Sequence, residues 1–209
     1  GTKRGGLYKS TNNGELWIPI NEGIENVQGE SINSISIDAS YMMYIATRYN
    51  QVYKSTDNGQ TWIRKSNGLP STYIWTTEIN SLGYLFALAS SEVYRSTDQG
   101  ENWIKVNSGL ENFIVTDLAI DSSNFLFSST MGGGIFRSSN NGDTWSAVNF
   151  GLPFLDCNNI NVVNNGILFT VLDDYSNPLF RSTDNGESWN QVGNGLENQP
   201  VLSVDADSA

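Results

Sequence analysis

The sequence predicts an all-β protein, a β-propeller of four-stranded antiparallel blades, and three observations lead to this prediction. One pattern recurs five times, and its tryptophans at positions 17, 62, 103, 145 and 189 step by 45, 41, 42 and 44 residues. Each period contains four short strand-like segments, and no segment shows sustained helical periodicity. A repeat of about 40 residues with four short strands is typical of a propeller blade. An open solenoid or a sandwich is the alternative, but solenoid coils normally have a shorter period.

The repeated pattern itself predicts two strands joined by a tight turn. Its first half, as in Val52–Ser55, is β-branched and aromatic, which favours a strand. Asp57-Asn58-Gly59 supplies residues that accept positive φ, as hairpin turns require. The tryptophan then opens the second strand, as in Trp62-Ile-Arg-Lys.

Two further strands fill the rest of each period. The first is Val115–Asp121, with counterparts at Ile32–Asp38 and Ile74–Asn80. The second includes Phe125–Phe127, and a turn of Asp, Ser, Asn or Gly separates the two. We designate the four strands of a blade A, B, C and D in chain order.

The two ends of the chain fall inside one blade. Val201–Ala209 aligns with a strand A, and Gly1–Tyr8 aligns with the end of strand B and the start of strand C. Residues 1–209 thus form a single propeller domain of four complete blades and one blade divided between the termini. Either the ends meet in that fifth blade, or the chain is a fragment of a larger propeller. We favour the fragment, because natural boundaries rarely fall inside a hydrophobic strand.

Composition excludes several classes of function. The net charge is −11, and such an acidic surface repels phosphate backbones, so nucleic acid is not an expected partner. No apolar stretch approaches the roughly 18 residues of a membrane span, so no membrane insertion is expected. The chain has no His, which removes Ser-His-Asp catalysis and His-ligated metal sites, and its one Cys157 cannot form an internal disulfide. We expect no metal and no cofactor.

The segment Ser55-Thr-Asp-Asn-Gly-Gln-Thr-Trp62 resembles an Asp-box, also called a BNR repeat, and the resemblance recurs in all five units. Propellers with this box include sialidases, xyloglucanases, sortilin-type receptors and a photosystem II assembly factor. The resemblance implies a structural hairpin between strands C and D, away from any active centre. The Asp or Asn side chain accepts hydrogen bonds within the turn, and the tryptophan packs between sheets. The residues concerned are Asn12, Trp17, Asp57, Trp62, Asp98, Trp103, Asn140, Trp145, Asp184 and Trp189.

An enzyme is less expected than a binding module. The Arg-Ile-Pro segment of sialidases is missing, and Trp17-Ile-Pro19 is only a partial likeness, so sialidase activity is disfavoured. Glycoside hydrolysis needs two carboxylates that face one sugar bond. Xyloglucanases use two propeller domains, and this chain provides at most one. A fragment of a sialidase-like or xyloglucanase-like hydrolase remains the alternative, and we assign no catalytic residue. Carboxylates outside the boxes are Glu78, Asp117, Asp156, Asp173 and Asp174.

The binding site is expected on the variable loops. The D–A and B–C loops share one end of every blade and vary in length and chemistry, whereas the A–B and box turns at the other end are nearly constant. Aromatic side chains beside polar groups suit a glycan or a protein partner. Packing of Trp75 and Phe154 between blades is the alternative for those two residues. The candidate ligand-binding residues are Arg48, Tyr49, Tyr73, Trp75, Phe154, Asp173, Asp174 and Tyr175.

The sequence therefore predicts a non-catalytic binding or scaffold module that recognises a protein or a glycan. Abundant Asn and few Lys favour an extracellular or cell-surface location. A purely structural assembly role is a third possibility.

Overall fold

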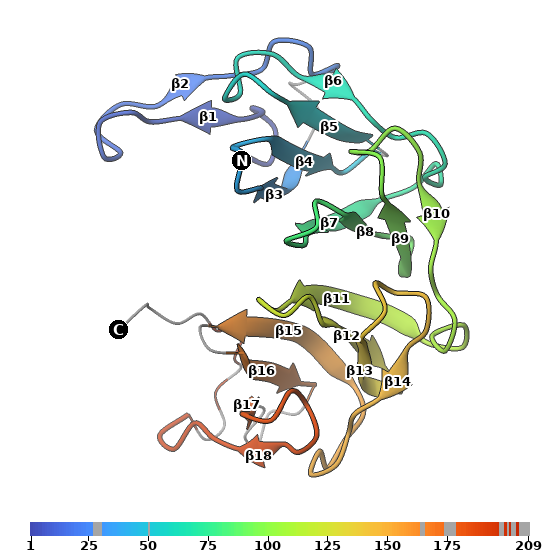
Figure 1. Cartoon of the computed structure of the whole chain (residues 1–209). Coiled ribbons are helices and arrows are strands. Elements are labelled where there is room, and N and C mark those ends of the chain that lie inside the picture. The colour runs from blue at the N-terminus through green and yellow to red at the C-terminus, as the bar shows by residue number, and fades with distance from the viewer. Residues whose placement is uncertain are drawn as a thin grey trace. The chain divides into compact units, whose positions relative to one another are not determined.

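The computed structural model describes residues 1–26, 31–49, 51–163, 166–173 and 179–196, together with Gln199, Val201 and Val204. The described residues contain the strands β1 to β18, which form antiparallel sheets (Figure 1). The two-stranded sheet contains β1 (Tyr8–Lys9) and β2 (Ile18–Pro19). The four-stranded sheets contain β3 (Ile32–Ile37), β4 (Met43–Thr47), β5 (Gln51–Ser55) and β6 (Ile63–Arg64); β7 (Ile74–Ile79), β8 (Leu85–Ala89), β9 (Glu92–Ser96) and β10 (Ile104–Lys105); β11 (Ile114–Ile120), β12 (Leu126–Met131), β13 (Gly134–Ser138) and β14 (Ser146–Ala147); and β15 (Cys157–Val163), β16 (Ile167–Leu172), β17 (Leu179–Ser182) and β18 (Asn190–Gln191).

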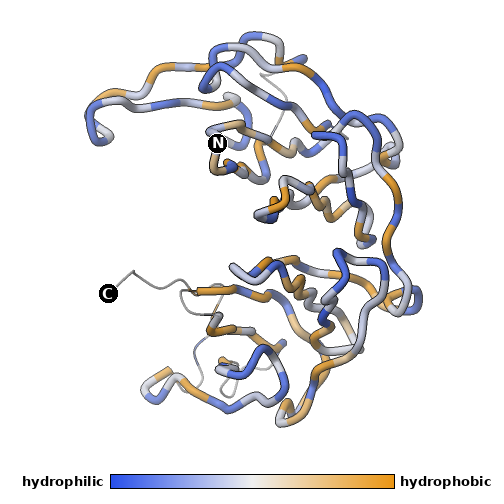
Figure 2. The backbone as a smooth tube through the Cα atoms, in the orientation of Figure 1, coloured by the Kyte–Doolittle hydropathy of each residue, from blue (hydrophilic) through white to orange (hydrophobic). Residues whose placement is uncertain are grey.

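The sheets confirm the predicted blades. In each four-stranded sheet, consecutive strands pair in chain order, so the strands correspond to A, B, C and D. The two-stranded sheet corresponds to strands C and D of the blade that the sequence predicts to be divided between the termini. Nearly all of the strand A predicted for that blade, Val201–Ala209, lies outside the described residues. Apolar and polar residues are interleaved along the strands (Figure 2). This pattern is typical of short strands that bury part of their surface against a neighbouring layer.

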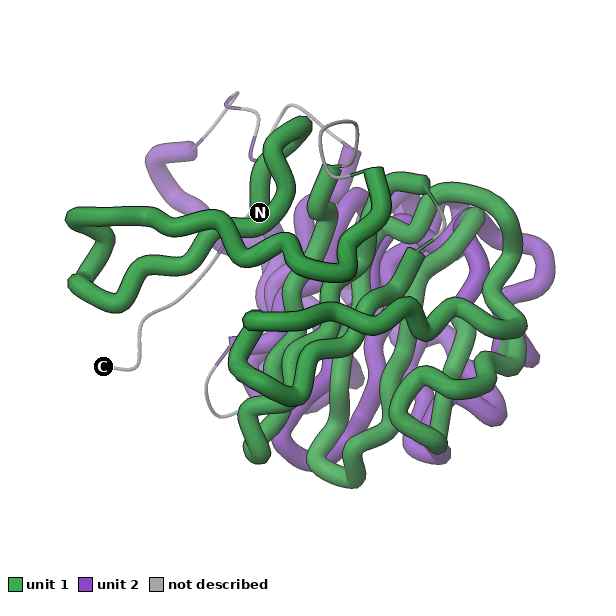
Figure 3. The backbone as a smooth tube through the Cα atoms, turned by 90° about the horizontal axis from the view of Figure 1, so that it is seen from above, with its two compact units in different colours: residues 1–90, 94–105 green, residues 91–93, 106–209 purple. Residues whose placement is uncertain are grey.

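The chain divides into two compact units, which are described separately (Figure 3). Unit 1 is Gly1–Ser90 with Tyr94–Lys105, and unit 2 is Ser91–Val93 with Val106–Ala209. In unit 1 the core residues include Tyr44, Ile74 and Leu85. In unit 2 they include Phe127 and Leu168.

The turn between strands C and D has the same hydrogen bonds in each repeat, and we call the five segments from its Ser to its Trp the box turns. In Ser55–Trp62, the Ser55 hydroxyl donates to Asp57 Oδ1 (2.8 Å) and accepts from the Gly59 amide (2.9 Å). The Thr61 amide donates to Asp57 Oδ1 (2.8 Å). Asn58 and Gly59 have φ of 62° and 83°, which explains the Asn-Gly pair. The other box turns are Ser10–Trp17, Ser96–Trp103, Ser138–Trp145 and Ser182–Trp189.

Four box tryptophans join consecutive blades. The indole N–H of Trp62 donates to the Ile20 carbonyl (2.9 Å), and that of Trp103 donates to the Lys65 carbonyl (2.9 Å). In unit 2, Trp145 and Trp189 bond in the same way to Val106 and Val148. In each case the acceptor lies three residues after the preceding box tryptophan. These four indoles are only 3% to 5% exposed.

Trp17 is different. Its side chain is 58% exposed, so the expectation that every box tryptophan packs between sheets does not hold for this one. The box turn around it still forms, because Asn12 Oδ1 accepts from the Ser10 hydroxyl and from the Leu16 amide. The turn is a local structure, whereas burial of the indole requires the outer strand of another blade.

Each of the four strands A that the structure describes carries a β-bulge at the same position. The registers of β3, β7, β11 and β15 each shift around one extra residue, and these residues are Asn33, Trp75, Thr116 and Asn158. A bulge leaves its extra residue out of the ladder and turns that side chain in a new direction. Bulges therefore place one side chain per blade near the start of strand A.

Candidate ligand-binding site

Three aromatic side chains form a row at the D–A and B–C end of unit 1. Tyr49 lies in the loop between β4 and β5, Tyr73 directly precedes β7, and Trp75 is the bulge residue of β7. The ring centroids of Tyr49 and Tyr73 are 6.3 Å apart, and those of Tyr73 and Trp75 are 5.8 Å apart. We call these three residues the aromatic shelf.

The shelf is open to solvent. The exposed fractions are 55% for Tyr49, 43% for Tyr73 and 53% for Trp75. Trp75 is therefore not buried between blades, which was the alternative for this residue. Contiguous exposed aromatic rings are uncommon on soluble proteins unless a ligand or partner covers them.

The β-bulge explains how Trp75 comes to be exposed. At the equivalent position of β3, Asn33 Nδ2 donates to the Ile74 carbonyl (2.7 Å). In unit 2, the Thr116 hydroxyl donates to the Cys157 carbonyl (2.7 Å). Both polar side chains thus bond to the first residue of the next strand A, whereas Trp75 places an exposed indole beside Tyr73.

Arg48 lies against the shelf. Its guanidinium carbon lies 5.3 Å from the centroid of the Tyr73 ring, within the range of a cation–π contact. Its backbone amide donates to the Ser31 carbonyl (3.0 Å), which anchors the loop. Arg48 forms no ion pair with any residue that the structure describes.

A cavity of about 440 Å³ adjoins the shelf within unit 1. Its walls come from the N-terminal segment, from the start of β3, and from Arg48 and Trp75. Lys3 lines it too, and the sequence analysis missed this residue. The sequence contains a signal for it, because alignment of Gly1–Tyr8 with Ser129–Phe136 pairs Lys3 with Met131, where strand B meets the B–C loop. The described lining residues are Gly1, Thr2, Lys3, Ser31, Ile32, Asn33, Arg48 and Trp75.

The other described B–C loops offer no comparable side chains. Ser90 and Ser91 form a two-residue turn with φ of 51° and 64°. The corresponding turn in the next blade contains Gly132 and Gly133. Only small residues occupy these two loops, so neither of these two blades has an aromatic B–C loop equivalent to the one that carries Tyr49.

The remaining predicted site residues are not part of the shelf. Phe154 is exposed in unit 2, in the loop before β15, so it too is not packed between blades. Asp173 follows β16 in unit 2, where its amide donates to the Asp156 carbonyl (2.9 Å). Asp174 and Tyr175 lie outside the described residues. The structure thus brings together Arg48, Tyr49, Tyr73 and Trp75.

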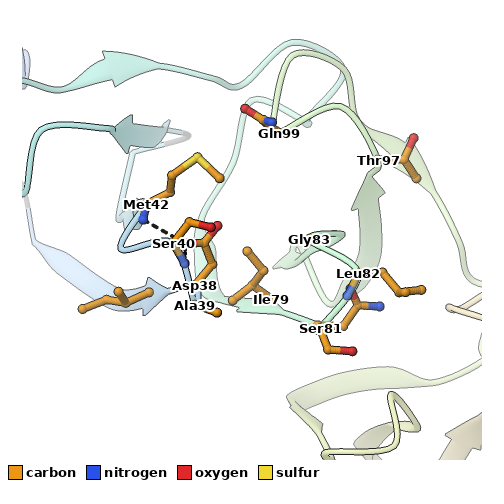
Figure 4. A pocket seen from close by; sticks show the side chains of 12 residues that line it. Asp38, Ala39, Ser40, Met42, Ile79, Ser81, Leu82, Gly83, Thr97 and Gln99 are labelled. Atoms are coloured by element: carbon orange, nitrogen blue, oxygen red, sulfur yellow. Dashed lines mark hydrogen bonds between the residues drawn. The ribbon is translucent and has the colours of Figure 1, made fainter.

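The opposite end of the unit 1 blades has a cavity of about 490 Å³, which Figure 4 shows from close by. Two A–B turns and the Ser96–Trp103 box turn form its walls. Asp38 Oδ1 accepts from the amides of Ser40 and Met42, both at 2.8 Å. Asn80 Oδ1 accepts from the amides of Leu82 and Tyr84. These two oxygens already serve their own turns, and a ligand would compete with them.

The carboxylates fall into two groups. The pKa of each of the three box carboxylates is lowered to about 2, chiefly by a side-chain hydrogen bond within its own turn. The donor is Thr61 for Asp57, Asn102 for Asp98, and Ser188 for Asp184. In contrast, burial in β11 raises the pKa of Asp117 to about 6. Among the described residues, no three His, Cys, Asp or Glu side chains gather as a metal ion would need.

Comparison with known proteins identifies the family. The model of the DUF6242 beta propeller domain matches residues 16–166. The chain belongs to this β-propeller family. No curated protein matches the chain.

Solved structures share the fold at low sequence identity. YCF48 bound to D1 peptide matches with a TM-score of 0.68 and 17% identity over 92% of this chain and 62% of that one. A GH74 xyloglucanase from Xanthomonas campestris matches with a TM-score of 0.70 and 17% identity over 99% of this chain and 36% of that one. The extracellular domain of a hybrid two component system from B. thetaiotaomicron has a TM-score of 0.62 and 14% identity, over 89% of this chain and 26% of that one. The chain thus spans less than two thirds of each of these three proteins.

Within the described ranges, the structure contains no helix of the length and apolarity that crossing a membrane requires.

Proposed function

We propose that this chain is a non-catalytic carbohydrate-binding propeller module, which holds a glycan against the aromatic shelf. The observation that carries the proposal is the row of three exposed rings, Tyr49, Tyr73 and Trp75, at centroid spacings of 6.3 Å and 5.8 Å. Aromatic faces provide large and rigid apolar contacts, and the apolar faces of sugar rings stack on them. Consecutive rings in a row suit consecutive sugar units of a chain.

The site has the other features of a small binding surface. The lining of the cavity beside the shelf combines the cationic Lys3 and Arg48 with the apolar Ile32, and the hydroxyls of Ser31 and Thr2 there donate to the carbonyls of Lys3 (2.6 Å) and Gly6 (2.9 Å). Aromatic contact area with a few convergent polar groups is the usual composition of a ligand site. The fold itself is compatible with such a role, since one similar structure is a xyloglucanase.

A protein segment is the other ligand class that the sequence leaves open, and the similar YCF48 structure holds a D1 peptide. The shelf favours a glycan, because its rings stand in a row. A peptide-binding groove would commonly offer an exposed strand edge or separate side-chain pockets.

Two further parts of the proposal concern family and location. We infer that the five repeats are Asp-boxes of the BNR type, which the shared hydrogen bonds of the box turns support. We also propose an extracellular or cell-surface location, in keeping with a glycan ligand. One protein of similar fold is an extracellular domain.

Binding to a glycan array tests the proposed function. The full chain should bind at least one oligosaccharide, and Trp75→Ala should weaken that binding about tenfold, because one stacking surface is lost. Trp17→Ala is the matched control, since Trp17 is equally exposed but lies in a box turn. The proposal fails if the array shows no binding, or if Trp17→Ala and Trp75→Ala weaken it equally.

Glycoside hydrolysis is the second candidate, and one observation favours it. Burial raises the pKa of Asp117 to about 6, as expected for a general acid. A second facing carboxylate is also required. We expect no release of reducing ends from β-glucans or sialosides by this chain. Turnover that Asp117→Asn abolishes would reverse this assignment.

A further inference from the structure

The charge around the cavity beside the shelf differs from that of the whole chain. Acidic residues outnumber basic ones by 22 to 11 over the sequence. The described lining of the cavity nevertheless contains two cationic side chains, Lys3 and Arg48, and no Asp or Glu. This concentration of positive charge lies next to the exposed indole of Trp75, which lines the same cavity.

Among the described residues, no hydrogen bond or ion pair joins the Arg48 guanidinium to a carboxylate or a carbonyl, in contrast to three other basic residues. Lys65 pairs with Glu101, and Arg137 pairs with Glu187 at 2.8 Å. Lys9 donates to the Asn58 carbonyl (3.3 Å). The guanidinium of Arg48 instead lies over the Tyr73 ring, and it has no ion pair within the part of the chain that the structure describes.

This arrangement leaves the donors of Arg48 available to a ligand. A guanidinium carries five N–H donors in its plane, and a contact between its face and an aromatic ring does not use them. The fork geometry of these donors matches a carboxylate, to which they can bond in a bidentate manner. Lys3 on the same cavity supplies a second positive charge at a more flexible position.

We propose that the ligand of this site is an acidic glycan, in which a uronic acid carboxylate bonds to Arg48 and Lys3 while the sugar rings stack on Tyr73 and Trp75. This inference rests on the proposed carbohydrate-binding function. It adds the chemical class of the sugar and assigns the discrimination between acidic and neutral chains to Arg48. An acidic peptide would satisfy the two cations but would make poorer use of the row of rings.

Matched oligosaccharides isolate the contribution of the carboxylate. The full chain is titrated with hexamers of galacturonate and of mannuronate, each beside its methyl-esterified counterpart, by isothermal titration calorimetry at 0.15 M salt. At that ionic strength the rest of the acidic surface is screened beyond about 8 Å. We expect at least one acidic hexamer to bind about tenfold or more tightly than its ester, because charge-assisted hydrogen bonds are the stronger ones.

Substitutions test whether Arg48 causes the preference for the acid over its ester. Arg48→Gln should remove the preference for the acid over the ester, and Lys3→Gln should reduce this preference in part. Arg64→Gln, an exposed arginine on β6, is the matched control and should keep the full preference. Trp75→Ala should weaken acid and ester alike, because both stack on the indole.

The outcomes separate the two proposals. Equal binding of acid and ester overturns the acidic ligand but leaves the carbohydrate-binding function in place. A preference that survives in Arg48→Gln overturns the role of Arg48. If the chain binds a hexa-glutamate peptide but neither hexuronate, the proposal that the ligand is a glycan is overturned. Absence of binding to all acids and esters contradicts the acidic ligand, and an additional absence of binding across the glycan array contradicts the function itself.

Discussion

The box tryptophans and Trp75 have the same side chain in opposite environments. Trp62 and Trp103 are buried, and each donates its indole N–H to a carbonyl of the preceding blade. Trp75 is half exposed on a β-bulge and contacts Tyr73. The difference shows that a tryptophan of this repeat is structural where another blade covers it, and is available to a ligand where a bulge turns it outward.

Trp17 shows which factor separates the buried box tryptophans from Trp75. It has the sequence context of the buried box tryptophans and the exposure of Trp75. Burial is therefore decided by the neighbouring strand and not by the motif. This makes Trp17 the natural control for substitutions in both groups.

The largest effect is expected for a buried box tryptophan. Trp103→Ala should lower the free energy of unfolding by about 3 to 5 kcal/mol, because a large aromatic side chain leaves a cavity. Trp17→Ala should change it by only about 0.5 kcal/mol, as is usual for an exposed site. Urea denaturation of the two variants and the wild type measures both values. Equal losses in the two variants would show that the box motif, and not the blade contact, determines the contribution.

The second largest loss of stability is expected for Gly68, a glycine that packs against Trp103. Gly68 has φ of 92°, and a Cβ atom there would lie 2.3 Å from the Trp103 carbonyl oxygen. Gly68→Ala should therefore cost about 2 to 4 kcal/mol, from left-handed strain together with the overlap. Gly83 has a similar φ of 77° but no atom within 4 Å of such a Cβ, so Gly83→Ala should cost only about 1 to 2 kcal/mol. Equal losses of unfolding free energy for Gly68→Ala and Gly83→Ala in urea denaturation would mean that the contact between Gly68 and Trp103 can shift to accommodate a methyl group.

The two groups of carboxylates predict a stability optimum near pH 4. The pKa of Asp117 is about 6 in the folded chain against 3.8 for the ordinary group, so its contribution is full below about pH 4 and is lost as the pH rises through 6. The pKa values of Asp57, Asp98 and Asp184 are about 2, so their contribution is full above about pH 4 and is lost as the pH falls through 2.

Thermal melts across the pH range test this optimum. The melting temperature should rise from pH 7 to pH 4 and then fall. Asp117→Asn should remove the rise and leave the fall. A wild-type melting temperature that does not change between pH 7 and pH 4 would contradict the buried state of Asp117.

Much of the fold follows from the sequence alone. The spacing of the box tryptophans and the Asn-Gly turns predict strands C and D, and the apolar alternation of segments such as Ile32–Asp38 predicts strand A. The exposure of Trp17 could not be predicted, because it depends on a strand that the local sequence does not specify. The bulge at Trp75 is a property of register between two strands, which a single strand sequence does not reveal.

The candidate site could be predicted only in part. The variable loops indicated Arg48, Tyr49, Tyr73 and Trp75, and the structure places these four side by side. Lys3 was not predicted, because it precedes the first complete blade, and its approach to Arg48 and Trp75 depends on how the N-terminal segment packs beside β3. Whether these residues bind a ligand is a prediction, and it calls for a direct measurement.

An effect on stability as small as that of Trp17→Ala is expected at the shelf, where Trp75→Ala should change the free energy of unfolding by about 0.5 kcal/mol. Such a variant would remain folded, so any loss of binding could be assigned to the indole. Urea denaturation is the check, and a loss as large as that of Trp103→Ala would place Trp75 in the core.

The most direct test of the shelf is the response of the indole N–H signals to a glycan. The chain has six tryptophans, so a ¹⁵N-labelled sample gives six indole cross-peaks that substitutions can assign one by one. On titration with the hexagalacturonate and hexamannuronate oligomers, the Trp75 peak should shift, and the peaks of Trp17 and the four buried box tryptophans should stay in place. Shifts confined to the box tryptophans, with the Trp75 peak unmoved, would contradict the shelf as the binding site.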